Sequence, residues 1–143
     1  MLIPIIGSVA RADEIDDIIP FVIIAESGGD SNAVSPAGAV GLMQITPIVL
    51  KEYRQECNAI RNVEVEDLKN PHLNKAIGEW YLRRLKDHYF RDNYTLERML
   101  CAWNGGITKL RRYDYDCSKM PRESREFSKK VMRLHQASKK KTR

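Results

Sequence analysis

Apolar residues recur along the chain with the 3.6-residue period of an α-helix, in stretches that glycine, proline or asparagine separates. Sustained period-two alternation, which indicates half-buried β-strands, is nearly lacking, and the sequence has no internal repeat. Each such helix has to bury its apolar face against its neighbours. The pattern therefore predicts a mainly α domain with at most a small β-hairpin or loop region.

The first predicted helix ends at Gly28-Gly29, and Pro20 inside it should kink or restart it. Residues 30–44 are rich in Ser, Asn, Gly and Pro, which favours loops or a small hairpin. Thr46 followed by Pro47 is typical of an N-cap and the first position of a second helix. The apolar stripe of the first helix consists of Ile15, Ile18, Ile19, Val22 and Ile23.

The longest amphipathic pattern predicts a helix over residues 73–89, after a polar connection over residues 58–71. A further helix over residues 95–103 should end at Asn104-Gly105-Gly106, and a last one should begin near Ser124. The apolar face of the longest helix is predicted to carry Leu73, Ala76, Ile77, Trp80, Tyr81, Leu85 and His88.

The length of 143 residues predicts one compact domain over residues 1–137, followed by a basic, flexible tail over residues 138–143. A net charge of +5 and a pI near 9.2 favour anionic partners, such as nucleic acid, acidic membrane surfaces or bacterial wall polymers. Much of the charge lies in residues 109–112 and in the tail, which is more typical of a solvated surface than of a nucleic-acid-binding stripe. Charge alone does not choose among these partners.

Three cysteines, Cys57, Cys101 and Cys117, leave at least one unpaired in a monomer and match no metal or redox box, so no disulfide framework is predicted. Residues 1–12 have a short apolar run but no basic segment before it, and we interpret them as mature protein. No stretch approaches the roughly 18 consecutive apolar residues of a membrane span.

Glu26 continues the apolar stripe of the first helix, four positions after Val22, so its carboxylate should point towards the core at the end of that helix. Desolvation and the negative end of the helix dipole both disfavour the ionised form. We therefore predict a raised pKa, as a glycosidic general acid needs. Periodicity leaves open the alternative that Glu26 turns outward at a frayed helix end.

Four segments carry a resemblance to a known family. They read E-S-G-G-D over residues 26–30, S-P-A-G-A-V-G-L-M-Q over residues 35–44, N-P-H-L-N-K-A-I-G-E-W-Y-L-R-R-L over residues 70–85, and A-W-N-G-G over residues 102–106. In this order they closely resemble the lytic transglycosylase domain family, of the soluble lytic transglycosylase type, across residues 15–131. The resemblance implies an α+β, goose-type-lysozyme-like fold with a substrate groove.

The same resemblance implies roles for individual residues. The glutamate of the family's Glu-Ser pair is its catalytic acid/base, which maps to Glu26. A side-chain amide such as that of Gln44 can also hydrogen-bond the acetamido groups of sugars, although a structural turn would explain this stretch too. Helix capping would likewise explain Asn104. The positions mapped to the substrate groove are Ser27, Ser35, Met43, Gln44, Trp103, Asn104 and Glu123.

The chain departs from the family's pattern at three positions. Trp103 stands where the family usually has Tyr, and an indole N–H can donate a hydrogen bond but cannot accept one. Trp103 would therefore either orient Glu26 differently or serve as a stacking surface. Phe127 stands where Tyr is usual, in the segment 121–128, and Thr46 where Met is frequent. These changes concern the substrate in detail more than the class of reaction.

Glycosidases usually use two carboxylates, and the sequence offers no obvious partner for Glu26, because Asp30, Asp87 and Asp92 are better explained as surface residues. The resemblance implies instead that Glu26 protonates the glycosidic oxygen after N-acetylmuramic acid and then deprotonates the C6 hydroxyl, which gives a 1,6-anhydro product. One alternative is a hydrolytic lysozyme (muramidase) of the same fold, with a carboxylate such as Asp30 positioning water. Another is a catalytically silent module that binds wall glycan or nucleic acid.

Peptidoglycan glycan strands are thus the predicted partner, with no nucleic acid and no membrane span, and the chain is predicted to be a monomer. No metal or other cofactor is predicted, because His72, His88 and His135 lack ligand spacing and no nucleotide-binding glycine motif occurs. Action is expected in the periplasm or the extracytoplasmic wall. The lack of a convincing signal peptide favours a phage-encoded chain or export by a partner system.

Overall fold

The computed structural model describes residues 13–57 and 62–142, and these residues form a mainly α structure, as predicted. Within them the only β-structure is a pair of isolated bridges, from Val34 to Val40 and from Val40 to Ile45. The helices are α1 (Glu14–Glu26), α2 (Pro47–Glu56), α3 (Pro71–Arg84), α4 (Leu96–Gly105), α5 (Ile107–Arg112) and α6 (Arg122–Lys141). Four short helical segments connect them: η1 (Glu66–Lys69), η2 (Leu85–Phe90), η3 (Arg91–Asn93) and η4 (Cys117–Lys119).

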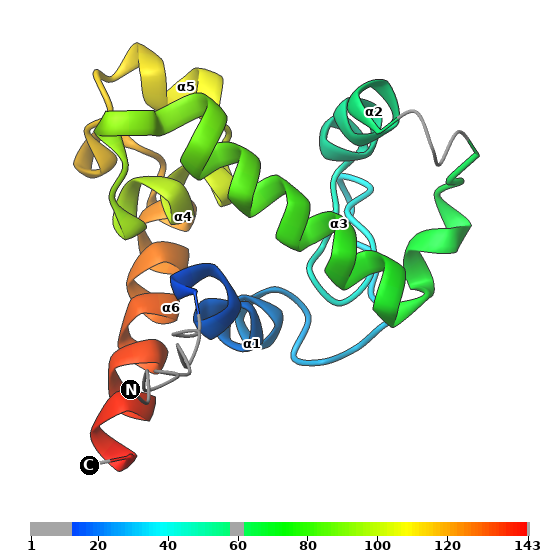
Figure 1. Ribbon diagram of the computed structural model, residues 1–143, viewed down its shortest axis with the longest axis horizontal. Coiled ribbons are helices and arrows are strands. Elements are labelled where there is room, and N and C mark those ends of the chain that lie inside the picture. The colour runs from blue at the N-terminus through cyan, green and yellow to red at the C-terminus, as the bar shows by residue number, and fades with distance from the viewer. Residues whose placement is uncertain (1–12, 58–61, 143) are drawn as a thin grey trace, which may run out of the picture.

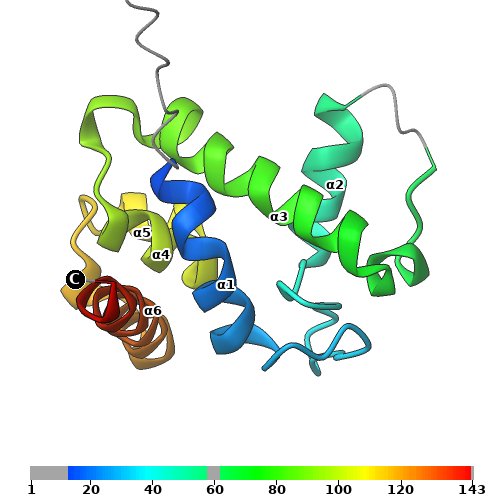
Figure 2. The ribbon, with the colours of Figure 1, turned by 60° about the horizontal axis from the view of Figure 1, so that its bottom comes forward.

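The helix α3 crosses the molecule and joins two groups of elements (Figure 1). On one side α4 packs against α5 and α6, and α1 lies against α6. On the other side lie α2 and the loop of residues 28–45, which Figure 2 shows extending away from the end of α1. An ion pair between Arg84 of α3 and Glu52 of α2, both mostly buried, holds this second group to α3. The C-terminal end of α1 therefore lies between the two groups.

The helix α1 follows the sequence pattern closely, with Ile15, Ile18 and Val22 fully buried. Pro20 neither ends nor restarts it, because it lies on the exposed face of one continuous helix. The helix ends where predicted: Gly28 and Gly29 have φ angles of 64° and 90°, which residues other than glycine rarely adopt. This exact stopping point fixes Glu26 as the last helical residue.

The predicted hairpin or loop region and the predicted start of α2 are both confirmed. The two bridges close the loop of residues 33–45 on itself. The hydroxyl of Thr46 accepts a hydrogen bond from the amide of Val49 at 3.3 Å, and Pro47 is the first residue of α2. Because α2 starts at a fixed residue, the loop between α1 and α2 is held at both ends.

The predicted face of the longest helix is partly wrong. The helix begins at Pro71 and continues beyond Arg84 as a wider π-helical turn to Phe90. Its buried face includes Asn74 and Gly78, whereas Ala76 and His88 are exposed. A pattern of apolar residues could not reveal this face. Asn74 is polar, but it can be buried because its side-chain amide is fully hydrogen-bonded. Gly78 is buried because Met43 packs where a larger side chain would lie.

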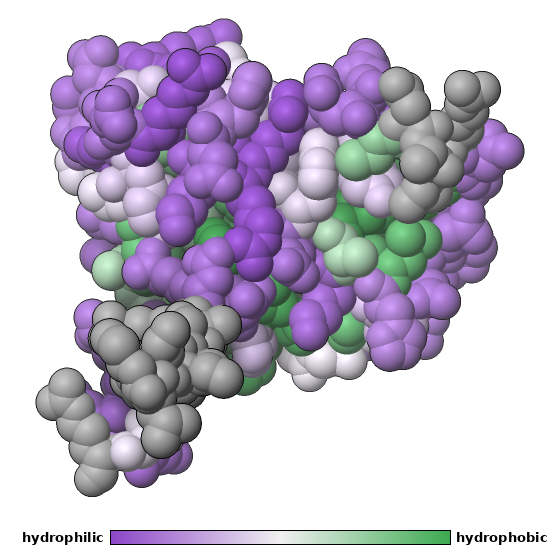
Figure 3. Space-filling model, in the orientation of Figure 1, coloured by the Kyte–Doolittle hydropathy of each residue, from purple (hydrophilic) through white to green (hydrophobic). Residues whose placement is uncertain are grey.

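The face of the molecule shown in Figure 3 is mostly hydrophilic, and its hydrophobic residues gather towards the group of elements that contains α2. None of the described helices is both long enough and apolar enough to cross a membrane. The segment predicted to be a flexible tail continues α6 as far as Lys141. The interpretation of residues 1–12 as mature protein lies outside the described residues.

Candidate active site

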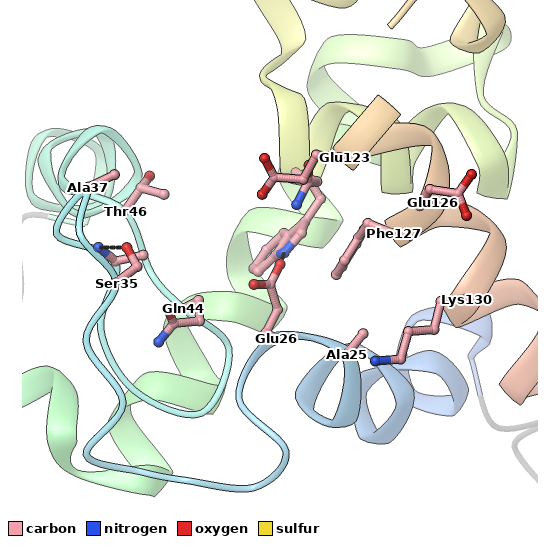
Figure 4. Close-up of a pocket in the computed structure, with 13 residues that line it drawn as sticks. Ala25, Glu26, Ser35, Ala37, Gln44, Thr46, Glu123, Glu126, Phe127 and Lys130 are labelled. Atoms are coloured by element: carbon pink, nitrogen blue, oxygen red, sulfur yellow. Dashed lines mark hydrogen bonds between the residues drawn. The ribbon is translucent and has the colours of Figure 1, made fainter. Parts of the chain in front are cut away.

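A groove of about 500 Å³ lies between the two groups of helices, with Glu26 at its floor (Figure 4). The loop of residues 33–46 forms one wall, and the end of α4 with the first turns of α6 forms the other. Segments far apart in the sequence thus meet at the end of α1. The residues that line the groove are Ala25, Glu26, Ser35, Ala37, Ala39, Gln44, Thr46, Trp103, Asn104, Glu123, Glu126, Phe127 and Lys130.

The carboxyl group of Glu26 is largely removed from water, and this burial raises its pKa from the ordinary value of 4.5 to about 7. A hydrogen bond from Trp103 opposes the rise, because it stabilises the charged form, and the negative charge of Glu123 adds to it. The raised pKa predicted from the sequence is thereby confirmed, with burial as its largest cause. At neutral pH this carboxyl group is close to half protonated, so it can either give or take a proton.

Glu26→Gln is expected to stabilise the protein at alkaline pH. The folded state binds the Glu26 proton more tightly than the unfolded chain does, so the free energy of unfolding falls as pH rises from 4.5 to about 7. Above pH 7 the buried charge costs about 3 kcal/mol. Urea unfolding should therefore show the variant more stable by up to about 3 kcal/mol near pH 8 and little different near pH 4. An equal difference at both pH values would contradict a buried, titrating Glu26.

Trp103 lies at the end of α4, in the wall that faces the loop, and its side chain contacts Glu26. Its indole Nε1–H donates a hydrogen bond of 3.0 Å to Oε1 of Glu26, and its ring packs against Tyr81 of α3, with centroids 5.8 Å apart. The second carboxyl oxygen is left on the groove side (Figure 4). Of the two roles that the sequence left open for Trp103, this hydrogen bond favours the orienting one, and both stay predictions.

Trp103→Phe should move the alkaline limb of the pH–rate profile to higher pH. The variant loses the N–H that stabilises the carboxylate, so the pKa of Glu26 should rise above about 7. Activity that needs protonated Glu26 then persists to higher pH, at a rate lowered roughly tenfold by looser orientation. Trp80→Phe, at an indole that packs on Tyr53 and Arg84 outside the groove, is the matched control and should leave the limb in place. A limb that stays put or moves down in Trp103→Phe would refute this role.

The loop wall is held by hydrogen bonds of its own. Gln44 adopts a φ of 51°, and its Nε2 donates to the carbonyl oxygens of Ala33 and Gly41, each at 3.1 Å. The hydroxyl of Ser35 accepts from the amide of Ala39 at 3.0 Å. Among the described residues no donor reaches Oε1 of Gln44. This oxygen can therefore accept a hydrogen bond from an N–H or O–H group of a ligand.

Most of the residues that the resemblance mapped to the groove meet there, but two lie elsewhere. Ser27 ends α1, where its hydroxyl donates to the carbonyl of Ile23 and accepts from the amide of Gly29. Met43 is fully buried beneath the loop and packs on Gly78. The residues that meet in the groove are Glu26, Ser35, Gln44, Trp103, Asn104 and Glu123.

The groove also contains Glu126 and Lys130, which the sequence interpretation missed. Both follow Glu123 on α6 at helical spacing, by three and seven positions, and so share its face. Once Glu123 is placed in a groove, this spacing predicts the other two. The sequence analysis did not use this spacing because it placed the start of the last helix near Ser124, which left Glu123 outside the helix. The helix α6 in fact begins at Arg122.

Besides Glu26, the carboxylates Glu123 and Glu126 lie in the groove, whereas Asp30, the water-positioning carboxylate that the hydrolytic alternative named, does not. Asp30 is exposed, and its side chain accepts from the amide of Asn32 at 2.9 Å rather than lining the groove. Asp87 and Asp92 belong to η2 and η3, outside the groove lining. Glu123 of α6 lines the groove and acts on the charge of Glu26, so it is the residue to compare with Glu26.

The sequence as a whole matches known proteins. The transglycosylase SLT domain family matches residues 6–124, which is most of the chain. The chain is also 37% identical over 71 residues to the endo-type membrane-bound lytic murein transglycosylase A of two strains of Klebsiella pneumoniae. This match covers 49% of the chain and 35% of each relative, so the chain spans about a third of the length of the curated relatives it matches.

Proposed function

The chain belongs to the transglycosylase SLT domain family, and on that premise we propose that it is a peptidoglycan lytic transglycosylase. Its substrate is the glycan strand of the wall, cleaved at the β-1,4 bond between N-acetylmuramic acid and N-acetylglucosamine. The observation that supports the proposal is Glu26, a partly buried carboxyl group with a pKa of about 7 on the floor of the groove. A single group with this pKa suits a reaction in which it acts first as acid and then as base.

The reaction begins with protonated Glu26, which gives its proton to the glycosidic oxygen as the bond to C1 of the muramic acid breaks. Positive charge develops at C1, and Glu26 is now a carboxylate beside it. The carboxylate takes the proton of the C6 hydroxyl, while O6 bonds to C1 and closes the 1,6-anhydro ring. No water is consumed. Trp103 donates to Oε1 throughout, and its bond strengthens when Glu26 is charged, which favours proton release at the first step.

Both walls of the groove offer groups that suit a sugar chain. Gln44 and Ser35 on the loop wall, and Asn104 on α4, supply side-chain oxygens and nitrogens for hydroxyl and acetamido groups. Glu26 lies between these walls (Figure 4), so a sugar chain held by both walls would cross its carboxyl group. We propose that these residues hold the two sugars that flank the scissile bond.

Hydrolysis is the second candidate, and the presence of Glu123 in the same groove favours it. An inverting or retaining glycosidase needs a second carboxylate to activate water or to bond C1. Glu123 lines the same groove as Glu26, and its charge raises the pKa of Glu26. In this alternative Glu123 activates the water, and the product gains a reducing end.

Mass spectrometry of muropeptides released from purified peptidoglycan separates these functions. The proposed transglycosylase releases products that end in 1,6-anhydro-N-acetylmuramic acid. Products heavier by one water, with a reducing end, would replace this proposal with hydrolysis. Binding to the insoluble wall without any release would replace it with the catalytically silent module.

Because peptidoglycan lies outside the cytoplasm, we further propose that the chain acts in the extracytoplasmic wall. The monomeric state, and a phage-encoded or partner-exported origin, stay predictions of the sequence.

A further inference from the structure

Two cysteines that are distant in the sequence line the same small cavity, away from the groove. Cys101 lies in the middle of α4, and Cys117 begins η4. Both side chains line a second, smaller cavity of about 130 Å³, together with Glu97, Ser118, Arg125 and Lys129. The groove around Glu26 shares none of these residues.

The two thiols influence each other's titration. Cys117 is the largest cause that lowers the pKa of Cys101, and Cys101 is the largest cause that raises the pKa of Cys117. Cys117 Sγ also lies 3.6 Å from the carbonyl oxygen of Glu97, which is one helical turn before Cys101 on α4. This contact puts the sulfur of Cys117 against the turn of α4 that leads to Cys101. Cys57, the third thiol, belongs to the end of α2 in the other group of elements.

The surroundings favour reaction at this pair. Cys101 is 0% and Cys117 is 7% exposed, so the cavity is the route by which a reagent reaches them. Arg125 and Lys129 on α6 line the cavity, and positive charge near a thiol favours the reactive thiolate. The nearby Ser128 hydroxyl also lowers the pKa of Cys101, whereas the negative charge of Glu97 raises it. An anionic oxidant is therefore attracted to the cavity, and Cys101 is the better nucleophile of the two.

We propose that Cys101 and Cys117 are a disulfide-forming pair, oxidised by a small disulfide such as oxidised glutathione. The Cys101 thiolate attacks one sulfur of the oxidant, forms a mixed disulfide and releases one glutathione thiolate. The released glutathione thiolate takes the proton of Cys117, whose sulfur then attacks the Cys101 sulfur and releases the second glutathione thiolate. Two cysteine thiols are oxidised, one disulfide is reduced to two glutathione molecules, and the two cysteine protons pass to them.

The new bond would tie η4 to α4 and close a loop that contains α5 and Trp103. It lies two residues from Trp103, so it restrains the helix that positions Glu26 without touching the groove. Disulfides persist in oxidising spaces outside the cytoplasm, and only this setting rests on the function proposed above. The chemistry itself requires no glycan.

Thiol counting on the full chain tests the proposal, with Cys57→Ser as the background so that only the pair can react. After treatment with oxidised glutathione and trapping in denaturant, both remaining thiols should be lost and the mass should fall by two hydrogens. The thermal midpoint should rise by roughly 5–10 °C and return when dithiothreitol is added. In the variant that combines Cys57→Ser with Cys117→Ala, glutathione should instead remain bound to Cys101 as a mixed disulfide. The thermal midpoint of this variant should not rise.

Any of three results would contradict the proposed disulfide between Cys101 and Cys117. Both thiols could remain titratable after oxidation, glutathione could stay attached with both cysteines present, or the midpoint could fall on oxidation because the fold does not accommodate the bond. None of these readouts depends on peptidoglycan, so loss of the proposed enzymatic function would leave the result unchanged. Conversely, a failed pairing would say nothing against the role of Glu26.

Discussion

Glu26→Gln should lower the rate of muropeptide release by roughly two to four orders of magnitude while the protein stays folded. Glutamine keeps the shape of the side chain and can still accept a hydrogen bond from Trp103 through its amide oxygen. It cannot protonate the glycosidic oxygen, and it cannot take the proton of the C6 hydroxyl. Both steps of the proposed reaction are therefore lost together, and initial rates of soluble product release measure the loss.

Asp87→Asn is the control for a charge change of the same kind. Asp87 is an exposed carboxylate on η2, outside the groove lining, so the variant should retain the rate of the unmodified chain. Unchanged helical circular dichroism of Glu26→Gln would show that the loss is chemical rather than structural. A loss of less than about tenfold in Glu26→Gln would remove it from the acid/base role.

Glu123→Gln distinguishes transglycosylation from hydrolysis, because the loss of rate that it causes can be compared with the loss caused by Glu26→Gln. If Glu26 acts alone, Glu123 only modulates it, and removing the negative charge lowers the pKa of Glu26 and shifts the alkaline limb to lower pH. The maximal rate then changes little. If Glu123 activates water, its loss costs as much as the loss of Glu26, at every pH. Rates measured across pH 5 to 9 separate a shifted profile from a lowered one.

The part of this site that could be predicted from sequence is the part set by local rules. Two glycines with positive φ end α1, which makes Glu26 the last residue of an apolar stripe and raises its pKa. Periodicity could not bring Trp103 to Glu26, and only the resemblance suggested it, because the contact depends on how α1 and α4 both pack against α6. The resemblance mapped Glu123 to the groove, but periodicity could not show that Asp30 stays outside it, because the side chain of Asp30 is used within its own turn.

Asn74 illustrates why a hydrophobic pattern missed part of the fold. It is fully buried on α3, where its Nδ2 donates to the carbonyl oxygens of Val40 at 2.7 Å and Leu68 at 2.9 Å. Its Oδ1 accepts from the amide of Met43 at 2.8 Å. One amide thus satisfies three buried backbone groups of two different connections. Gly41 has to be glycine beside it, because a Cβ there would collide with the Asn74 side chain.

Asn74→Ala should therefore lower the free energy of unfolding by about 3–5 kcal/mol, a large share of the stability of a domain of this size. The change leaves three buried backbone groups without partners and releases the loop that carries Gln44 into the groove. Asn70→Ala on the same helix is the matched control, because Asn70 is an exposed N-cap whose loss costs about 1 kcal/mol. Urea unfolding at neutral pH measures both. If the two variants lost the same free energy of unfolding, the three hydrogen bonds of Asn74 would contribute no more than an exposed N-cap does. Some other group would then hold the loop wall against α3.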